Sequence, residues 1–202
     1  MNGQFWDEKF SQTPSLYGAQ PNEFVREQLQ DKNPGEILFP GEGEGRNALY
    51  AASLGWKVTA LDQSEVARKH ALESAQLRGL SLDYLVCKAE VFIPKPKSFD
   101  ALAMIYFHLP LNIRESVHRK FEKSLKDNAL LIIEGFGRQQ LAYTSGGPKN
   151  LEMLYDLEEI KSSFPNILWE IEFDGILNLN EGQGHSGEGH IIRLLGKKQQ
   201  VV

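Results

Sequence analysis

The chain has 202 residues, of which 22 are basic and 27 are acidic, so its formal net charge is −5 at neutral pH. This length suits one α/β domain with a substantial core, and the acidic balance leaves no electrostatic footprint for nucleic acid or an anionic membrane surface. The single cysteine, Cys87, excludes an intramolecular disulfide, and we see no signal peptide or membrane-spanning apolar run, so we expect one cytoplasmic domain over residues 1–202.

The N-terminal segment is predicted to form two short helices before the sheet begins. Asn22 is suited to cap the second helix, and Asn33-Pro34-Gly35 ends it. We therefore expect residues 1–34 to form an N-terminal helical lid segment, and residues 35–202 to form the core of the domain.

Five apolar segments then alternate with helical segments, which predicts a doubly wound, mostly parallel sheet. The strands are expected at residues 36–40, 57–61, 82–87, 99–107 and 129–134. The helices are expected from the glycine-rich turn to Gly55, from Ser64 to Gly79, and at residues 113–125 and 155–164. The last two apolar segments, 167–173 and 190–195, flank a glycine-rich linker without a helix, so we expect a hairpin that adds a C-terminal antiparallel strand.

The most informative feature is the turn Gly41-Glu42-Gly43-Glu44-Gly45-Arg46, together with Asp62 at the end of the second strand. Three glycines at alternate positions accept positive φ angles and let a ligand lie against the backbone. A dinucleotide fingerprint needs glycine at the sixth position, where this chain has Arg46, and the two glutamates oppose a pyrophosphate. S-Adenosylmethionine is cationic and carries no phosphate, so it suits the turn better, and Asp62 can accept hydrogen bonds from both ribose hydroxyls.

The segments 40–48 and 54–64 resemble class I S-adenosylmethionine-dependent methyltransferases, and look most like the branch that contains the tellurite-resistance and thiopurine-type enzymes. Phe5–Phe10 and Tyr17-Gly18 also resemble the opening of that branch, whereas Glu42 stands where many members have a small residue or cysteine. The resemblance implies a single Rossmann-like methyltransferase domain that uses S-adenosylmethionine, releases S-adenosylhomocysteine and methylates a small molecule.

Ligands in open α/β sheets lie beyond the carboxyl ends of the strands, so the loops at that edge are the candidate site. The resemblance implies that Ala89 and Glu90 lie near the adenine, and it favours Tyr17 near the cofactor. The predicted cofactor-binding residues are Tyr17, Gly41, Glu42, Gly43, Gly45, Arg46, Asn47, Asp62, Gln63, Ala89, Glu90 and Tyr106.

Two histidines are candidates for catalysis. His108 follows the central strand, where an imidazole could take a proton from the substrate or only order the loop. His185 lies in the glycine-rich linker, which could be a substrate loop or a flexible hairpin. We expect no metal site, because no Cys pair or His-Glu-x-x-His helix accompanies the linker histidines, and we expect His70 and His118 on exposed helix faces.

The leading interpretation is methyl transfer by direct displacement, in which alignment of the nucleophile, the methyl carbon and the sulfur supplies much of the catalysis. Thiolates and chalcogen oxyanions need little or no deprotonation, whereas amines and hydroxyls need a base. Two alternatives stay open, an NAD-dependent oxidoreductase and a non-catalytic cofactor-binding module. We expect a monomer or a weak dimer.

Overall fold

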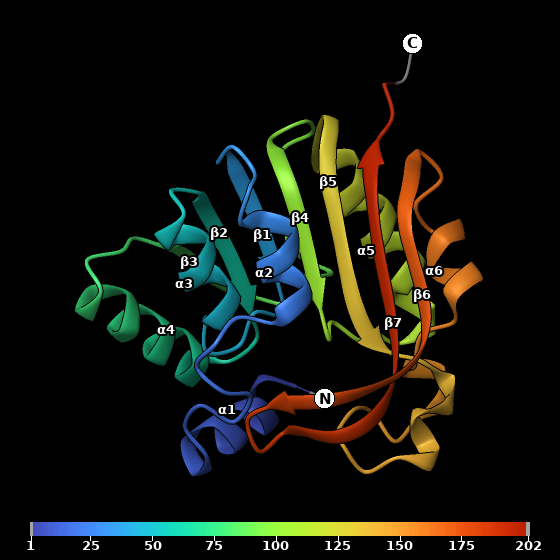
Figure 1. Cartoon of the computed structure of the whole chain (residues 1–202). Coiled ribbons are helices and arrows are strands. Elements are labelled where there is room, and N and C mark those ends of the chain that lie inside the picture. The colour runs from blue at the N-terminus through green and yellow to red at the C-terminus, as the bar shows by residue number, and fades with distance from the viewer. Residues whose placement is uncertain (1, 201–202) are drawn as a thin grey trace.

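Residues 2–200, described by a computed structural model, form a seven-stranded sheet with helices on both faces (Figure 1). The helices are α1 (Gly3–Gln12), α2 (Glu23–Leu29), α3 (Arg46–Ser53), α4 (Glu65–Leu77), α5 (Leu111–Ser124) and α6 (Leu157–Ser162). The strands are β1 (Glu36–Pro40), β2 (Lys57–Asp62), β3 (Asp83–Val86), β4 (Phe99–Ile105), β5 (Leu125–Phe136), β6 (Ile167–Glu181) and β7 (His185–Lys198). Two short 3-10 turns, Arg138–Ala142 and Leu151–Met153, precede α6.

The strand order is β3-β2-β1-β4-β5-β7-β6. Strands β1 to β5 run parallel to one another, and β7 runs antiparallel to both β5 and β6. The predicted fold, a doubly wound sheet that is mostly parallel with a C-terminal antiparallel strand, is confirmed. The chain reverses its strand order at β1, where β4 is added on the other side of β1 from β2.

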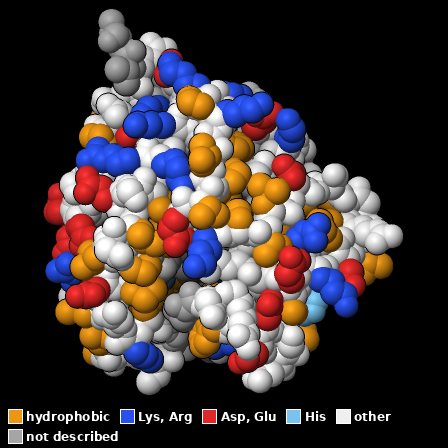
Figure 2. All heavy atoms as spheres, turned by 180° about the vertical axis from the view of Figure 1, so that it is seen from behind, with side chains coloured by type: hydrophobic (Ala, Val, Ile, Leu, Met, Phe, Trp, Pro, Cys, Tyr) orange, Lys and Arg blue, Asp and Glu red, His pale blue; other side chains and the backbone are white. Residues whose placement is uncertain are grey.

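Each face of the sheet carries its own apolar cluster because strand side chains alternate between the faces. On β1, Leu38 packs into the cluster with α5 and α6, whereas Ile37 and Phe39 pack into the cluster with α2, α3 and α4. Both faces of the central strands are thus covered, which explains their almost wholly apolar sequence. On the reverse side, basic and acidic side chains are interspersed with apolar ones (Figure 2).

The carboxyl ends of the parallel strands meet at one edge of the sheet, the lower edge in Figure 1. Helix α1, the tip of the β6–β7 hairpin and the loop between β5 and α6 gather at this edge (Figure 1). These three segments come from distant parts of the chain, and together they enclose the strand ends.

Two predicted helix caps are present. The Asn22 side chain accepts a hydrogen bond from the Val25 N–H at 3.1 Å, and the Ser64 hydroxyl accepts one from the Ala67 N–H at 3.0 Å. Each cap satisfies an N–H group that has no partner within its own helix.

The C-terminal hairpin is longer than the sequence predicts. Gly187 and Gly189, expected in a linker, lie within β7, and the turn is confined to residues 182–184. Leu179, also expected in the linker, is buried in a third apolar cluster with Phe136. Glycine fits inside this strand because a Cβ on Gly189 would lie 2.7 Å from the Ser145 hydroxyl, so the close approach of the neighbouring loop requires it.

One helix face was also predicted wrongly. His118 is fully buried rather than exposed, since α5 packs against the segment after α6 and the imidazole stacks on Phe164 with ring centroids 4.8 Å apart. The prediction failed because the residues next to His118 in sequence are polar and do not indicate its contact with Phe164. None of the helices formed by residues 2–200 combines the length and apolar character that a membrane span requires.

Candidate functional site

A cavity of about 680 Å³ lies at the carboxyl edge of the sheet. This volume falls within the range of about 300–1,000 Å³ typical of small-molecule sites. Thirteen of the fourteen predicted site residues line it: Tyr17, Gly41, Glu42, Gly43, Arg46, Asn47, Asp62, Gln63, Ala89, Glu90, Tyr106, His108 and His185. The exception is Gly45, which begins α3 and packs against Ala71, where a Cβ would lie 2.8 Å from the alanine side chain.

The cavity has two ends. The glycine end follows β1, β2 and β3 and is formed by Gly41, Gly43, Asp62 and Ala89. The aromatic end lies beyond β4, β5 and the start of β7, and its walls include Tyr106, Phe107, Phe136, Met153 and His185.

The glycine turn needs its glycines for both conformation and space. Gly41 and Gly43 have φ angles of 68° and 62°, in the left-handed region that other residues rarely adopt. A Cβ on Gly41 would lie 2.6 Å from the ring of Phe107, so the turn could not approach the loop after β4 with a larger residue. The backbone is thereby left open toward the cavity.

The two glutamates of the turn line the cavity and also accept hydrogen bonds from the protein backbone. Glu42 accepts hydrogen bonds from the N–H groups of Asn47 and Ala48 at 2.8 and 2.7 Å, so its carboxylate caps α3 in place of the side chain that Gly45 lacks. Burial raises the pKa of Glu42 to about 7, although these hydrogen bonds oppose the shift. Its carboxylate therefore caps the helix and also lines the cavity.

Glu44 and Arg46 hold the residues that precede α2. The Glu44 carboxylate accepts the N–H groups of Ser15 and Leu16 at 2.9 and 3.1 Å, and Arg46 donates to the Tyr17 carbonyl at 3.0 Å. From the other side, the N–H of Gly184 in the hairpin turn donates to the Leu16 carbonyl at 2.9 Å. We call residues 15–17 the strap, because it is fixed to both the glycine turn and the hairpin.

Aromatic side chains of the N-terminal segment continue this cover. Trp6 stacks on Phe10, and Phe10 meets the edge of Tyr17, with ring centroids 5.7 and 6.4 Å apart. Asp7 fixes α1 by accepting the Ser64 hydroxyl at 2.6 Å. Residues of α1 and the strap therefore line the cavity, whereas α2, which was predicted in the same lid segment, packs into the apolar cluster with α3 and α4.

Asp62 joins the glycine turn to the start of α4. One carboxylate oxygen accepts the Gly43 N–H and the other accepts the Ser64 N–H, each at 3.0 Å. Burial raises the pKa of Asp62, and the backbone donors oppose this. Each oxygen can accept a further hydrogen bond, so a ligand in the cavity would meet a carboxylate that is already oriented.

The segment after β3 is held from α5. The Lys120 ammonium donates to the carbonyls of Ala89 and Glu90 at 2.7 and 2.9 Å. This contact fixes the backbone that the sequence placed near an adenine. Nothing in the local sequence of residues 88–90 indicates it, since the donor lies thirty residues away.

His108 is placed in the cavity wall but is not free to act as a base. Its Nδ1 lies 2.8 Å from the Met153 carbonyl, and its Nε2 accepts the Phe136 N–H at 3.1 Å. Burial lowers the pKa of His108 to about 3. Both nitrogens have hydrogen-bond partners and the ring stays neutral. Of the two predicted roles, proton acceptor and residue that orders the loop, the geometry favours the second.

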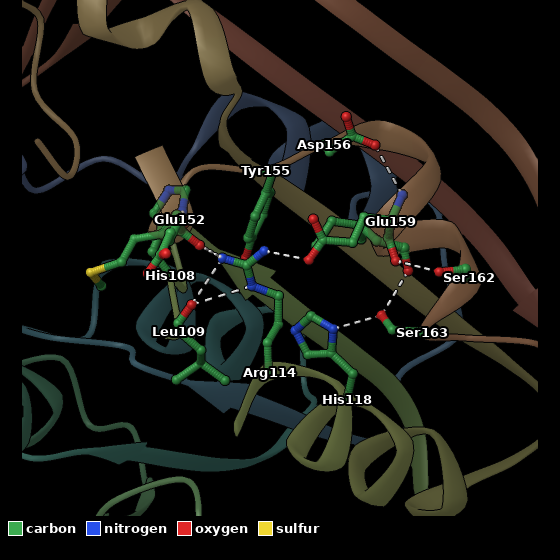
Figure 3. A network of polar contacts seen from close by, with 12 residues as sticks. His108, Leu109, Arg114, His118, Glu152, Tyr155, Asp156, Glu159, Ser162 and Ser163 are labelled. Atoms are coloured by element: carbon green, nitrogen blue, oxygen red, sulfur yellow. Dashed lines mark hydrogen bonds and ion pairs between the residues drawn. The ribbon is translucent and has the colours of Figure 1, made fainter. Parts of the chain in front are cut away.

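Sequence reasoning missed the residues that hold the aromatic end together. Arg114, at the start of α5, donates to the carbonyls of Leu109 and Glu152 and pairs with Glu159 at 2.8 Å (Figure 3). The Tyr155 hydroxyl donates to the Phe107 carbonyl at 2.5 Å. With His108, these side chains join residues 107–109, after β4, to residues 152–155, before α6; we call them the clamp.

The clamp explains how two irregular segments form a fixed wall. The two segments share no backbone hydrogen bonds with each other among residues 2–200, and side chains supply the connection. An arginine in the first turn of an otherwise polar helix resembles a surface residue, so no local pattern indicates the role of Arg114. Its side chain is nevertheless buried, with an exposure of only 3%.

The aromatic end surrounds His185 with rings. The His185 imidazole has ring centroids 4.0 Å from Tyr106, 4.4 Å from Tyr17 and 5.1 Å from Phe136. Tyr106 reaches it from the end of β4 with a φ of 51°, an uncommon value for a residue with a side chain. His185 is therefore a fixed residue at the start of β7, rather than part of a flexible loop.

Comparison with known proteins gives one family match. Residues 37–128 match the methyltransferase domain family. A comparison with curated protein sequences found no similar sequence.

Several solved structures share the whole architecture. TehB from Haemophilus influenzae has a TM-score of 0.76 at 16% identity, over 96% of this chain and 67% of that one. A SAM-dependent methyltransferase from Methanosarcina mazei has a TM-score of 0.71 at 18% identity, over 90% of this chain and all of that one. A protein described for the conversion of a disulfide bond into a thioacetal group during echinomycin biosynthesis has a TM-score of 0.76 at 16% identity, over 98% and 91%. At these identities the likeness is one of fold.

Proposed function

We propose that the protein is a class I S-adenosylmethionine-dependent methyltransferase that methylates a small acceptor within the 680 Å³ cavity, because residues 37–128 match the methyltransferase domain family and the chain shares the fold of such enzymes. One observation carries this proposal. The same enclosure joins a glycine end suited to a nucleoside with an aromatic end that has room for a second molecule.

The glycine end supports a nucleoside in several ways. The open backbone at Gly41 and Gly43 gives a flat surface, and the oriented Asp62 carboxylate can accept both ribose hydroxyls. We assign the adenine to the neighbourhood of Gln63, Ala89 and Glu90, which line the cavity beyond Asp62. When bound, S-adenosylmethionine supplies a methyl group on a positively charged sulfur and leaves as neutral S-adenosylhomocysteine.

The aromatic faces of Phe10, Tyr17 and Tyr106 suit a cationic group at the centre of the cavity. Displacement at carbon gains most from alignment, and a wall fixed by the clamp and the strap supplies that alignment.

The charges along the cavity indicate the acceptor class. Its lining carboxylates are Glu42, Glu44, Asp62 and Glu90, and all of them lie at the glycine end. The aromatic end has no lining carboxylate among the described residues, whereas Lys149 lies at its rim. A cationic amine would lack a counter-charge there, so we propose a soft, neutral or anionic nucleophile, either a thiol or a chalcogen oxyanion.

Calorimetric titration with S-adenosylmethionine, S-adenosylhomocysteine and NAD tests the cofactor. We expect micromolar binding of both sulfur nucleosides and none of NAD; binding of NAD alone would refute the proposal. Transfer of a radiolabelled methyl group to a panel of thiols, selenite, tellurite and amines tests the acceptor class. Turnover with amines only would overturn the assignment of a soft nucleophile while leaving the cofactor unchanged.

A further inference from the structure

His185 has a buried nitrogen that its surroundings leave without a partner. The side chain is 6% exposed, and Nδ1 forms no hydrogen bond with any residue in the described part of the chain. The charged group near it is Glu181, whose Oε2 lies 3.9 Å from Nδ1. The two residues pair directly across the hairpin turn, at the end of β6 and the start of β7.

Glu181 is held in a fixed orientation. Its Oε2 accepts from Arg46 at 2.5 Å, and its Oε1 accepts from the Asn22 amide at 2.9 Å. Arg46 comes from the glycine turn and Asn22 from the N-terminal segment, so the carboxylate stands where three parts of the chain meet. A carboxylate anchored by two donors cannot turn away from the imidazole beside it.

This arrangement selects one tautomer of His185. The Glu181 carboxylate can only accept a hydrogen bond, so it favours a proton on Nδ1 and leaves the lone pair on Nε2. The distance of 3.9 Å exceeds a hydrogen bond, and contacts of this kind commonly shorten when a ligand fills the site. Nε2 has no hydrogen-bond partner within residues 2–200, and His185 lines the cavity.

We propose that His185, oriented by Glu181, removes a proton from the acceptor, and that the acceptor is a thiol rather than a chalcogen oxyanion. This inference rests on the proposed function. A pre-ionised oxyanion has no proton to lose, so a base fixed at the aromatic end has a use only for a protonated nucleophile. Thiol sulfur also packs well against the rings of Tyr106 and Phe136 and against Met153.

In the proposed step, the S–H bond of the acceptor breaks and its proton goes to Nε2 of His185. The acceptor sulfur forms a bond to the methyl carbon with the electron pair of the thiolate. The bond between that carbon and the sulfonium breaks, and its electron pair stays on the departing neutral thioether. The imidazolium then loses its proton to solvent, which restores the neutral base.

The electrostatic surroundings suit this role. Glu181 and Arg46 face His185 from β6 and α3, while Tyr17, Tyr106 and His108 approach it from the strap and from β4. Burial lowers the pKa of His185, and Glu181 opposes the shift. The ring is therefore neutral at pH 7 and able to accept a proton, but it is too weak a base for an unactivated alcohol.

The test compares aromatic thiols of graded acidity as acceptors, at a pH where the most acidic thiol is already ionised. We expect His185→Gln to lower the rate about 100-fold for the weakly acidic thiols and only a few-fold for the ionised one. Glu181→Gln should show the same pattern to a smaller degree. Glu188→Gln, an exposed change in the same hairpin, is the matched control and should behave as the wild type.

A second measurement does not depend on turnover. Long-range ¹H–¹⁵N NMR of the complex with S-adenosylhomocysteine should show the Nδ1–H tautomer of His185 in wild type and in Glu188→Gln, with loss of that preference in Glu181→Gln. An Nε2–H tautomer in wild type, an equal loss of rate for all thiols, or turnover of tellurite or selenite with no thiol turnover would overturn the proposal. Binding of S-adenosylhomocysteine to the same proteins tests the proposed cofactor site separately from the role of His185.

Discussion

Nδ1 of His108 lies 2.8 Å from the carbonyl oxygen of Met153, a contact that ties the loop after β4 to the segment before α6. The residue that the sequence offered as a base is thus a structural part of the cavity wall. The same wall is held by Arg114, which bonds to the carbonyls of Leu109 and Glu152. The aromatic end owes part of its shape to Arg114 and Tyr155, which are not among the residues that line the cavity.

Replacing Arg114 should therefore loosen one end of the cavity only. We expect Arg114→Met to lower the free energy of unfolding by about 3 kcal/mol, because Glu159 and two carbonyls lose a buried partner. Arg114→Lys should recover part of that loss of stability. In Arg114→Met, the affinity for the nucleoside should change less than the KM of the acceptor. Urea unfolding and calorimetry measure these effects. Arg119→Met, a change in the same helix at a side chain that is 36% exposed, is the control, and equal stability of the two methionine variants would contradict the clamp.

Glu42 should prove to be a helix cap. Removing its side chain leaves the N–H groups of Asn47 and Ala48 without an acceptor, so we expect Glu42→Ala to cost about 2 kcal/mol in the free energy of unfolding. Glu42→Gln keeps a carbonyl oxygen and should cost less than half as much. Thermal unfolding compares them with Glu27→Ala, an exposed change on α2. Equal losses for alanine and glutamine would show that capping is not the role of Glu42.

Asp62 should control nucleoside affinity. Loss of a charged acceptor should weaken binding of S-adenosylhomocysteine by about 10- to 100-fold in Asp62→Ala, equivalent to roughly 1.5–3 kcal/mol. Asp62→Asn retains one acceptor oxygen, so its affinity for S-adenosylhomocysteine should lie between those of the wild type and Asp62→Ala. Titration calorimetry measures both against Asp83→Ala, an exposed change on β3. If Asp62→Ala binds S-adenosylhomocysteine as tightly as the wild type, the ribose does not bind at Asp62.

His118 should make stability depend on pH. Burial, followed by the nearby charge of Arg114, lowers its pKa to about 3 in the folded state, whereas the unfolded value is about 6.5. The unfolded chain binds the extra proton first, so stability is complete above pH 6.5 and is lost as the pH falls toward 3, by roughly 1 kcal/mol per pH unit. His118→Phe keeps the stacking on Phe164 and should reduce this loss in urea unfolding at pH 6.5 and 5. Parallel pH profiles for wild type and variant would contradict the assignment.

The fold could be predicted from the sequence because its signals are local. Apolar strands, the caps at Asn22 and Ser64, and glycines at turns each act within a few residues, and the structure has these elements at nearly the predicted bounds. The hairpin was underestimated because glycine inside a strand reads as loop. Its place there depends on Ser145, which is remote in sequence.

The site was predictable as a set of loops, but not as a set of roles. Edge position, together with the family resemblance for Tyr17, Ala89 and Glu90, predicted thirteen residues that line the cavity. The partners of Glu42, His108 and His185 depend on which atoms the tertiary structure brings within hydrogen-bond reach. Arg114 was missed for the same reason, since a charged residue on a helix gives no sign of its burial before the neighbouring segment is placed.

The strap carries a consequence for kinetic order. Tyr17 reaches its place through Glu44 and Arg46, and both stand on the turn against which the nucleoside would lie. The entrance to the aromatic end therefore adopts its final structure only when the glycine turn is held in one conformation. We expect an ordered mechanism in which the nucleoside binds first and the nucleoside product is released last. S-Adenosylhomocysteine should then be a competitive inhibitor with respect to S-adenosylmethionine and a non-competitive inhibitor with respect to the acceptor.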